Sequence, residues 1–229
     1  MGLTLYIGNK NYSSWSMRAW VLMRALDIPF EERRLSFGDF GPDAPFRRAI
    51  AGLTPAGKVP VLVLDDGLAV WDTLAIAETL HDLFPGQGGW PDATPARARA
   101  RGLRAAQRSG SGTLRELCPM NIEAAMPEIG QRLWAEHEAL RRDVARIESM
   151  WADALAASGG PLLFCRFSAA DAFYAPVCMR LIGFGLPVSD VTRRYVERVR
   201  QHPAVADWIT QALAEHEFVA VDEPYRTAR

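Results

Sequence analysis

The segment GKVPVLVLDDGLAVWDTLAIAETLHDLF, residues 57–84, decides the fold of the first part of the chain. Two apolar runs, residues 59–64 and 68–71, flank an Asp-Asp-Gly turn. Because an Asp-Gly pair adopts the positive φ angles of tight turns, the two runs are predicted to form an antiparallel hairpin. Residues 72–84 follow with apolar side chains at helical spacing, which predicts a helix packed behind the hairpin.

Strand and helix signals alternate in the residues that precede this segment. Short runs of strand-forming residues and amphipathic stripes follow one another along this part of the chain. They predict strands at residues 3–7 and 30–35, and helices at residues 14–26 and 44–50. The predicted order is therefore βαβαββα, which is the thioredoxin-like pattern of a small mixed sheet with helices on both faces.

The character of the sequence changes after a linker rich in proline and glycine, residues 85–89. Residues 95–216 show helical periodicity and no convincing strand, and the apolar positions from Ile129 to Leu155 predict one long amphipathic helix. The predicted fold class is α/β plus all-α. A thioredoxin-like domain spans residues 1–85, and an all-helical C-terminal domain spans residues 86–229.

Composition excludes several classes of protein. The 229 residues carry a formal net charge of −1, which argues against the basic surface of a nucleic-acid-binding protein. No apolar run approaches the roughly 20 residues that span a bilayer, and the first residues lack the basic region of a secretory signal. We therefore expect a cytoplasmic protein that binds neither nucleic acid nor membrane.

The cysteines and histidines are scattered. Three cysteines, Cys118, Cys165 and Cys178, show no CxxC spacing, and the four histidines show no spacing typical of metal ligands. We expect reduced cysteines and no metal site. The basic residues are equally distinctive, because only Lys10 and Lys58 of the 26 are lysine.

Three segments carry a family resemblance: NYSSWSMRAW at residues 11–20, GKVP at residues 57–60 and WDTLAI at residues 71–76. Together with the two-domain layout, they resemble the soluble glutathione S-transferases, and a bacterial serine-type member with a zeta-like motif in particular. The resemblance implies that glutathione is a co-substrate, that a small electrophile is the second substrate, and that the chain forms a homodimer.

The first segment lies where the family keeps its thiol-activating residue. A free thiol titrates near a pKa of about 8.5, and both a helix N-terminus and a donated hydrogen bond favour the thiolate. Ser13 matches the first serine of the Ser-Ser-Cys variant of the family, and Ser14 and Tyr12 are the alternatives. Trp15 stands where that variant has cysteine, which argues against cysteine-assisted isomerisation. These serines could also simply cap a helix.

The other two segments correspond to the family's glutathione-binding residues. There, a cis proline turns the backbone of the preceding residue toward the cysteinyl part of glutathione, which assigns these roles to Pro60 and Val59. Lys58 would meet the glycyl carboxylate. Asp72 and Thr73 would hold the γ-glutamyl ammonium and carboxylate at a helix N-terminus. Without the resemblance, the GKVP segment could equally be an ordinary turn that enters a strand, and Asp72-Thr73 an ordinary acidic helix start.

Two alternatives to a transferase enzyme follow from the sequence. A transferase-like fold also suits a non-catalytic ligand-binding or interaction protein, since fold does not determine function. A thiol oxidoreductase is disfavoured, because no cysteine precedes Cys118. In the helical domain, the spacing of Ser168 and Asp171 predicts a capping box, which is a folding feature rather than a catalytic one.

Overall fold

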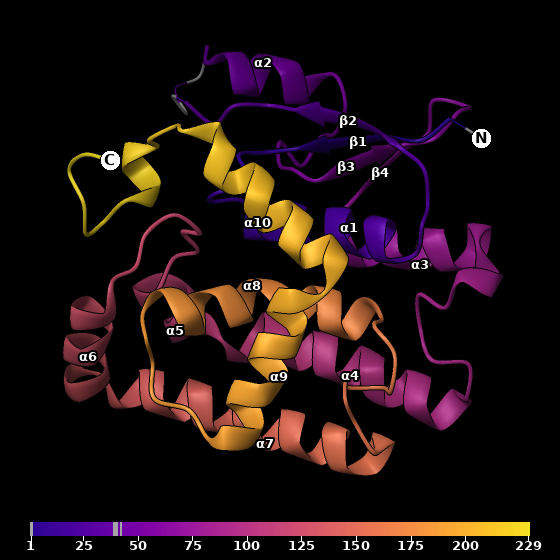
Figure 1. Cartoon of the computed structure of the whole chain (residues 1–229). Coiled ribbons are helices and arrows are strands. Elements are labelled where there is room, and N and C mark those ends of the chain that lie inside the picture. Colours follow the sequence, from indigo (N-terminus) through magenta and orange to yellow (C-terminus); the bar gives the residue numbers. More distant parts are fainter. Residues whose placement is uncertain (1, 39–40, 42) are drawn as a thin grey trace.

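The computed structural model describes residues 2–38, 41 and 43–229, and its first part is built on a four-stranded sheet (Figure 1). The strands are β1 (Thr4–Ile7), β2 (Glu31–Arg34), β3 (Val61–Val63) and β4 (Ala69–Trp71). Their spatial order is β2-β1-β3-β4. The β1 strand runs parallel to β2 and antiparallel to β3, and the β3–β4 pair is the predicted hairpin.

Helices cover both faces of this sheet. Figure 1 shows α2 (Pro45–Ala51) on one side, and α1 (Ser14–Ala25) and α3 (Thr73–Leu83) on the other. The side chains of neighbouring β3 residues point to opposite faces of the sheet. Leu62 belongs to the core that includes α1 and α3, whereas Val61 packs with Phe46 and Ile50 of α2. The predicted βαβαββα order is confirmed.

The rest of the chain is helical. Its elements are α4 (Thr94–Gly110), α5 (Gly112–Leu117), α6 (Pro127–Glu136), α7 (Glu138–Ser158), α8 (Ala169–Gly183), α9 (Asp190–Gln201) and α10 (Pro203–Glu215), with short 3₁₀ turns η1 (Pro85–Gln87) and η2 (Ala220–Asp222). Within the described residues, the only β pairing here is an isolated bridge between Phe164 and Arg166. The predicted fold class is therefore confirmed.

The prediction of one long helix over residues 129–155 was wrong. The chain breaks between α6 and α7 at His137, whose φ of −114° and ψ of 97° are extended. The side chain of Arg141 donates hydrogen bonds to the carbonyls of Trp134 and Ala135, which lie at the end of α6. The apolar spacing continues through the break because both helices bury their apolar faces in the same core.

The α8 helix lies at the centre of the helical part, and the predicted capping box starts it. Asp171 is fully buried and accepts hydrogen bonds from the backbone N–H groups of Ser168 (3.1 Å) and Leu163 (3.2 Å) and from the Tyr195 hydroxyl (3.0 Å). Burial raises the pKa of this carboxyl to about 6, against the opposing effect of these hydrogen bonds. Asp171 thus links the loop before α8, the start of α8 itself and the α9 helix.

The loop between β1 and α1 is held by the C-terminal end of the chain. The backbone N–H of Lys10 donates to Glu215 Oε1 at 2.8 Å, and the side-chain amide of Asn9 donates to Glu217 Oε2 at 2.7 Å. The hydroxyl of Tyr12 donates to Glu223 Oε1 at 2.7 Å. Consequently, residues more than 200 positions away set the direction in which α1 begins.

Replacing Asp171 by alanine should lower the free energy of unfolding by more than about 3 kcal/mol, because four buried donors, the Ser168 hydroxyl included, lose their acceptor at about 1–3 kcal/mol each. Urea denaturation followed by circular dichroism measures this loss. Asp190→Ala, which removes an exposed acid from the first turn of α9, is the matched control and should cost less than about 1 kcal/mol. Similar losses in both variants would contradict the assigned role of Asp171.

The raised pKa of Asp171 also predicts a pH dependence. The folded state binds the proton more tightly than the unfolded chain, so this residue's contribution to stability falls as pH rises from its ordinary pKa of 3.8 to about 6. Between pH 4 and pH 7, wild type should lose about 2 kcal/mol relative to Asp171→Asn. Denaturant titrations of both proteins at pH 4 and pH 7 measure the difference. Parallel pH profiles would refute the shift.

Candidate functional site

A cavity of about 500 Å³ lies between the two parts of the chain, within the size range of small-molecule sites. The first part contributes Tyr12, Ser13, Ser14, Trp15, Phe37, Phe46, Arg47, Ala56, Gly57, Lys58 and Val59, and the helical part contributes Arg115, Pro119, Met120, Arg180 and Asp222. Four predicted site residues, Ser13, Ser14, Lys58 and Val59, are therefore brought together. Pro60, Asp72 and Thr73 do not line this cavity.

The start of α1 places two serines at the cavity wall. Ser14 is the first residue of the helix, and Ser13 precedes it. The Ser13 side chain forms no capping hydrogen bond, so its role is not that of a helix cap. The first turn of a helix has backbone N–H groups without helical partners and a partial positive charge, which together favour an anion at this position.

The hydroxyl groups of the two serines differ in their partners. Ser13 Oγ lies 2.7 Å from Ser16 Oγ, which also accepts the backbone N–H of Gly8 at 3.0 Å. Because a hydroxyl group rotates, Ser16 can donate its proton to Ser13 and leave the Ser13 proton free for a ligand. The hydroxyl of Ser14 has no hydrogen-bond partner in the described part of the chain. Both can therefore donate to a group bound in the cavity.

Tyr12, the third hydroxyl considered, is already engaged. Its single proton points to Glu223 Oε1 at 2.7 Å, with the backbone carbonyl of Glu217 as a more distant acceptor at 3.2 Å, and its oxygen accepts the N–H of Val219. Burial, followed by the hydrogen bond to Glu223, raises the pKa of this phenol to about 12. Tyr12 therefore supports the C-terminal segment and has no free proton to offer a ligand.

The GKVP segment presents an unpaired edge of backbone beside these serines. The Val59–Pro60 peptide bond is cis. The backbone N–H and carbonyl of Val59 form no hydrogen bond with any described residue, and the exposed Lys58 ammonium forms no ion pair there. An extended peptide could therefore pair with Val59 while Lys58 approaches an anionic end of it.

Asp72 is held by partners from the helical part that sequence reasoning missed. Its Oδ1 accepts the N–H of Leu74 at 2.8 Å, as the N-cap of α3, and an Arg104 N–H at 3.1 Å, while Oδ2 accepts from Arg108 at 2.8 Å. A carboxylate offers about four acceptor positions, so about one remains. The two arginines lie more than 30 positions along the chain, on α4, where no local pattern connects them to Asp72.

Thr73, the first residue of α3, has a buried hydroxyl with no hydrogen-bond partner among the described residues. Buried hydroxyls are normally satisfied, so this one marks a position where a ligand or water belongs. The N-terminus of α3 surrounds it. A carboxylate would fit the chemistry of this group, because the hydroxyl and the helix N–H groups are all donors.

A buried arginine follows the serines about one turn further along α1. Arg18 is 1% exposed; its Nε donates to the Phe173 carbonyl at 3.1 Å, and its two terminal nitrogens lack partners within the described residues. Its guanidinium carbon is 4.1 Å from the Trp15 ring centroid. Burial, followed by the charges of Arg180 and Arg115, lowers the pKa of Arg18. The only feature of the sequence that pointed toward a buried arginine was its preference for arginine over lysine.

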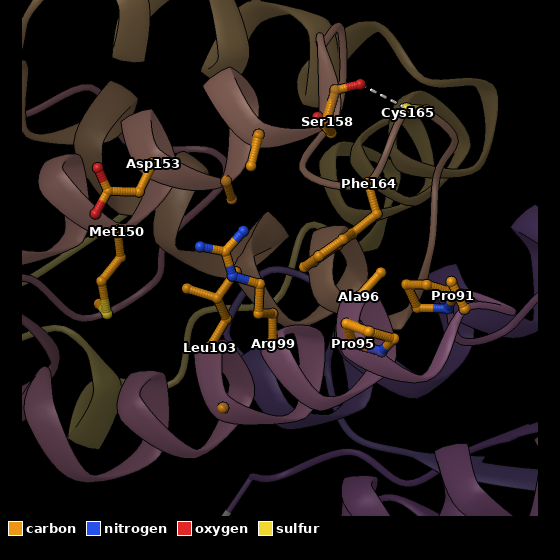
Figure 2. Close-up of a pocket in the computed structure, with 14 residues that line it drawn as sticks. Pro91, Pro95, Ala96, Arg99, Leu103, Met150, Asp153, Ser158, Phe164 and Cys165 are labelled. Carbon is orange, nitrogen blue, oxygen red and sulfur yellow. Dashed lines mark hydrogen bonds between the residues drawn. The ribbon is translucent and has the colours of Figure 1, made fainter.

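A second, larger cavity of about 640 Å³ lies between α4 and α7 (Figure 2). Its walls are mainly apolar, with Arg99 and Asp153 as the charged side chains. Cys165 lies at its edge, where its Sγ donates to the Ser158 carbonyl at 2.9 Å. None of the predicted site residues lines it. The smaller cavity is therefore the candidate functional site, because it joins free hydroxyl donors with the start of α1.

The described residues provide neither a cluster of potential metal ligands nor a membrane-spanning helix. No group of three or more histidine, cysteine, aspartate or glutamate side chains in this part of the chain could hold a metal ion. No described helix has the length and apolar character that crossing a membrane requires.

Comparison with known proteins agrees with this arrangement. Residues 12–83 match the family described as Glutathione S-transferase, N-terminal domain, and residues 121–211 match Glutathione S-transferase, C-terminal domain. Over 69 residues, the chain is 36% identical to dichloromethane dehalogenase of Methylorubrum extorquens. That segment covers 30% of this chain but only 23% of the relative's length.

Solved structures share the fold over nearly the whole chain. A glutathione transferase homologue from Burkholderia gl BGR1, with bound glutathione, has a TM-score of 0.69 and 24% identity, covering 94% of this chain and 100% of that one. A glutathione S-transferase from the Antarctic clam Laternula elliptica has a TM-score of 0.70 and 18% identity, covering 95% and 96% respectively. With two matched domains in the family's order, this chain belongs to the glutathione S-transferase family.

Proposed function

We propose that the protein is a glutathione transferase that generates the thiolate of bound glutathione at the start of α1 and directs it at a small electrophile. The observation that carries this proposal is the single cavity that joins free hydroxyl donors at a helix N-terminus to the unpaired backbone of Val59. Family membership supports it, as does the glutathione bound by the Burkholderia structure. We also propose a cytoplasmic homodimer, which light scattering would test.

The proposed binding of glutathione uses three parts of the first domain. The backbone of Val59, oriented by Pro60, pairs with the cysteinyl residue, and Lys58 meets the glycyl carboxylate. Thr73 and the N–H groups of α3 hold the γ-glutamyl carboxylate. Asp72 uses its remaining acceptor position for the γ-glutamyl ammonium. The two arginines that hold Asp72 thereby keep its carboxylate in place for the ligand.

The proposed activation of the thiol is electrostatic. Ser13 donates to the sulfur while Ser16 donates to Ser13, and Ser14 is the second candidate donor. The α1 N-terminus and the unpaired Arg18 guanidinium add positive potential, which stabilises a nearby anion. The thiol proton passes to water, and a sulfur electron pair then forms the bond to the electrophilic carbon. The bond from that carbon to its leaving group breaks, and the leaving group departs with the bonding electron pair. Lowering the thiol pKa raises the fraction of reactive thiolate at neutral pH.

Replacing Ser13 by alanine should raise the pKa of the bound glutathione thiol by about one unit, because a hydrogen bond to the charged sulfur contributes about 1.5 kcal/mol. The ultraviolet absorbance of the thiolate, followed against pH, measures this value. At pH 7 the rate should fall about tenfold, with the pH–rate profile displaced toward higher pH. Ser109→Ala, on the exposed surface of α4, is the control.

The same titration on Ser14→Ala decides between the two donors. A shift in Ser14→Ala with none in Ser13→Ala would make Ser14 the donor instead. An unchanged thiol pKa in both variants would refute activation by a hydroxyl. Binding of glutathione without turnover of any electrophile would leave the non-catalytic alternative, a ligand-binding protein of the same fold.

Thr73→Val should weaken glutathione binding about tenfold, because the γ-glutamyl carboxylate loses one charge-assisted hydrogen bond. The thiol pKa should stay unchanged, since the γ-glutamyl end binds away from the sulfur. Isothermal titration calorimetry measures the affinity. Thr210→Val, an exposed threonine of α10, should bind glutathione like wild type. Equal affinities in all three proteins would remove Thr73 from the binding site.

A further inference from the structure

The helical wall of the candidate site carries two arginines that the proposed chemistry does not use. Arg115 belongs to α5 and Arg180 to α8, and both line the cavity opposite Lys58 and Val59. Arg180 is 5% exposed. A buried guanidinium facing a cavity is costly to maintain unless a charged partner binds there.

Backbone carbonyls orient these two side chains without neutralising them. Arg180 Nη1 donates to the carbonyl of Cys118, and at 3.5 Å to that of Arg115. Arg115 Nη1 donates to the Gln107 carbonyl at 3.0 Å. Neither guanidinium forms an ion pair with a carboxylate of the residues that the structure covers. Each therefore retains its charge and unused N–H donors.

The nearby acid does not balance this charge. Asp222 also lines the cavity, but burial and then the charge of Glu223 raise its pKa, against the effect of Arg180. One carboxyl thus faces two guanidinium groups, and the buried Arg18 is close enough that the charges of both lower its pKa. Burial lowers the pKa of Arg180 to about 10, so it remains cationic at neutral pH.

Glutathione as proposed here leaves this wall free. Its glycyl carboxylate is assigned to Lys58 and its γ-glutamyl carboxylate to Thr73, both on the first domain. The sulfur is assigned to the start of α1, whose serines line the same cavity as the two arginines. The arginine pair therefore faces the space in which the second substrate must place its electrophilic carbon.

We propose that the second substrate is an electrophile that carries a carboxylate, and that Arg115 and Arg180 bind this carboxylate beside the glutathione sulfur. The inference rests on the proposed transferase function and deepens it. Guanidinium groups suit the task because their planar array of donors matches the geometry of a carboxylate. Arg115 and Arg180 are thus specificity-determining residues of the second-substrate site.

For a halogenated carboxylate, the step balances without any further reactant. The thiolate sulfur forms a bond to the carbon that bears the halogen, and the carbon–halogen bond breaks as halide leaves with its electron pair. The thiol proton has already passed to water, and the substrate carboxylate is unchanged. Two fixed cations would orient the carbon toward the sulfur and reduce repulsion between carboxylate and thiolate.

Binding of product-like glutathione conjugates tests the arginine pair without turnover. Calorimetry would compare S-(carboxymethyl)glutathione with S-(carbamoylmethyl)glutathione. A second pair with one more methylene group, S-(2-carboxyethyl)glutathione and S-(2-carbamoylethyl)glutathione, would be compared in the same way. Within each pair the two ligands have nearly the same shape and differ in charge. For at least one chain length, wild type should bind the carboxylate about tenfold more tightly than the amide.

Arg115→Met should remove most of this preference while its affinity for glutathione itself stays within about threefold of wild type, which also shows that the variant is folded. Arg180→Lys keeps the charge but loses the planar donor array, and should weaken the preference. Arg99→Met is the matched control, because Arg99 lines the other cavity (Figure 2) and should leave the preference unchanged.

The outcomes separate this inference from the function on which it rests. Equal binding of carboxylate and amide at both lengths, with glutathione still bound, would overturn the carboxylate site and leave the transferase proposal standing. A preference that persists in Arg115→Met and Arg180→Lys would overturn the role of these residues. No binding of glutathione or any conjugate would overturn the transferase proposal, and this inference with it.

Discussion

The attachment of residues 9–12 to the C-terminal end of the chain is the constraint on which the site depends. Glu215, Glu217 and Glu223 accept hydrogen bonds from this loop, which leads directly into α1. Burial opposes the charged form of Glu223, but hydrogen bonds from Arg226 and Tyr12 bring its pKa below the ordinary value. Because the folded pKa is lowered, the stabilisation is present at neutral pH and is lost in acid. The two parts of the chain thus meet where the chemistry is proposed.

Arginine dominates the electrostatics of this meeting point. Arg104 and Arg108 hold Asp72 from α4, while the two terminal nitrogens of Arg18 on α1 have no partner among the described residues. Arg115 and Arg180 extend the positive region into the cavity. Since guanidinium keeps its charge when buried more readily than ammonium does, an arginine-rich chain can sustain such a field away from water. The field favours anions on both sides of the proposed sulfur position.

Local patterns predicted the first domain well, because its strands, hairpin turn and helices follow from short-range periodicity. The turn at Gly67 and the capping box at Asp171 lie within a few residues of their signals, whereas the cis bond at Pro60 was implied by the family resemblance. The helix break at His137 was missed, because the apolar spacing runs through it. The hydrogen bond between Ser13 and Ser16, and the pairing of Asp72 with two arginines, also carry no local signal.

The sequence by itself determined the order of the elements, the family resemblance and the residues that approach glutathione in that family. These follow from the spacing of apolar side chains and from motifs whose members are adjacent in the chain. Only the tertiary structure decided which hydroxyls are free, which carboxylates are already paired and which arginines face the cavity. Hydrogen-bond partners and burial depend on distances between residues far apart in sequence, and no periodicity along the chain encodes them.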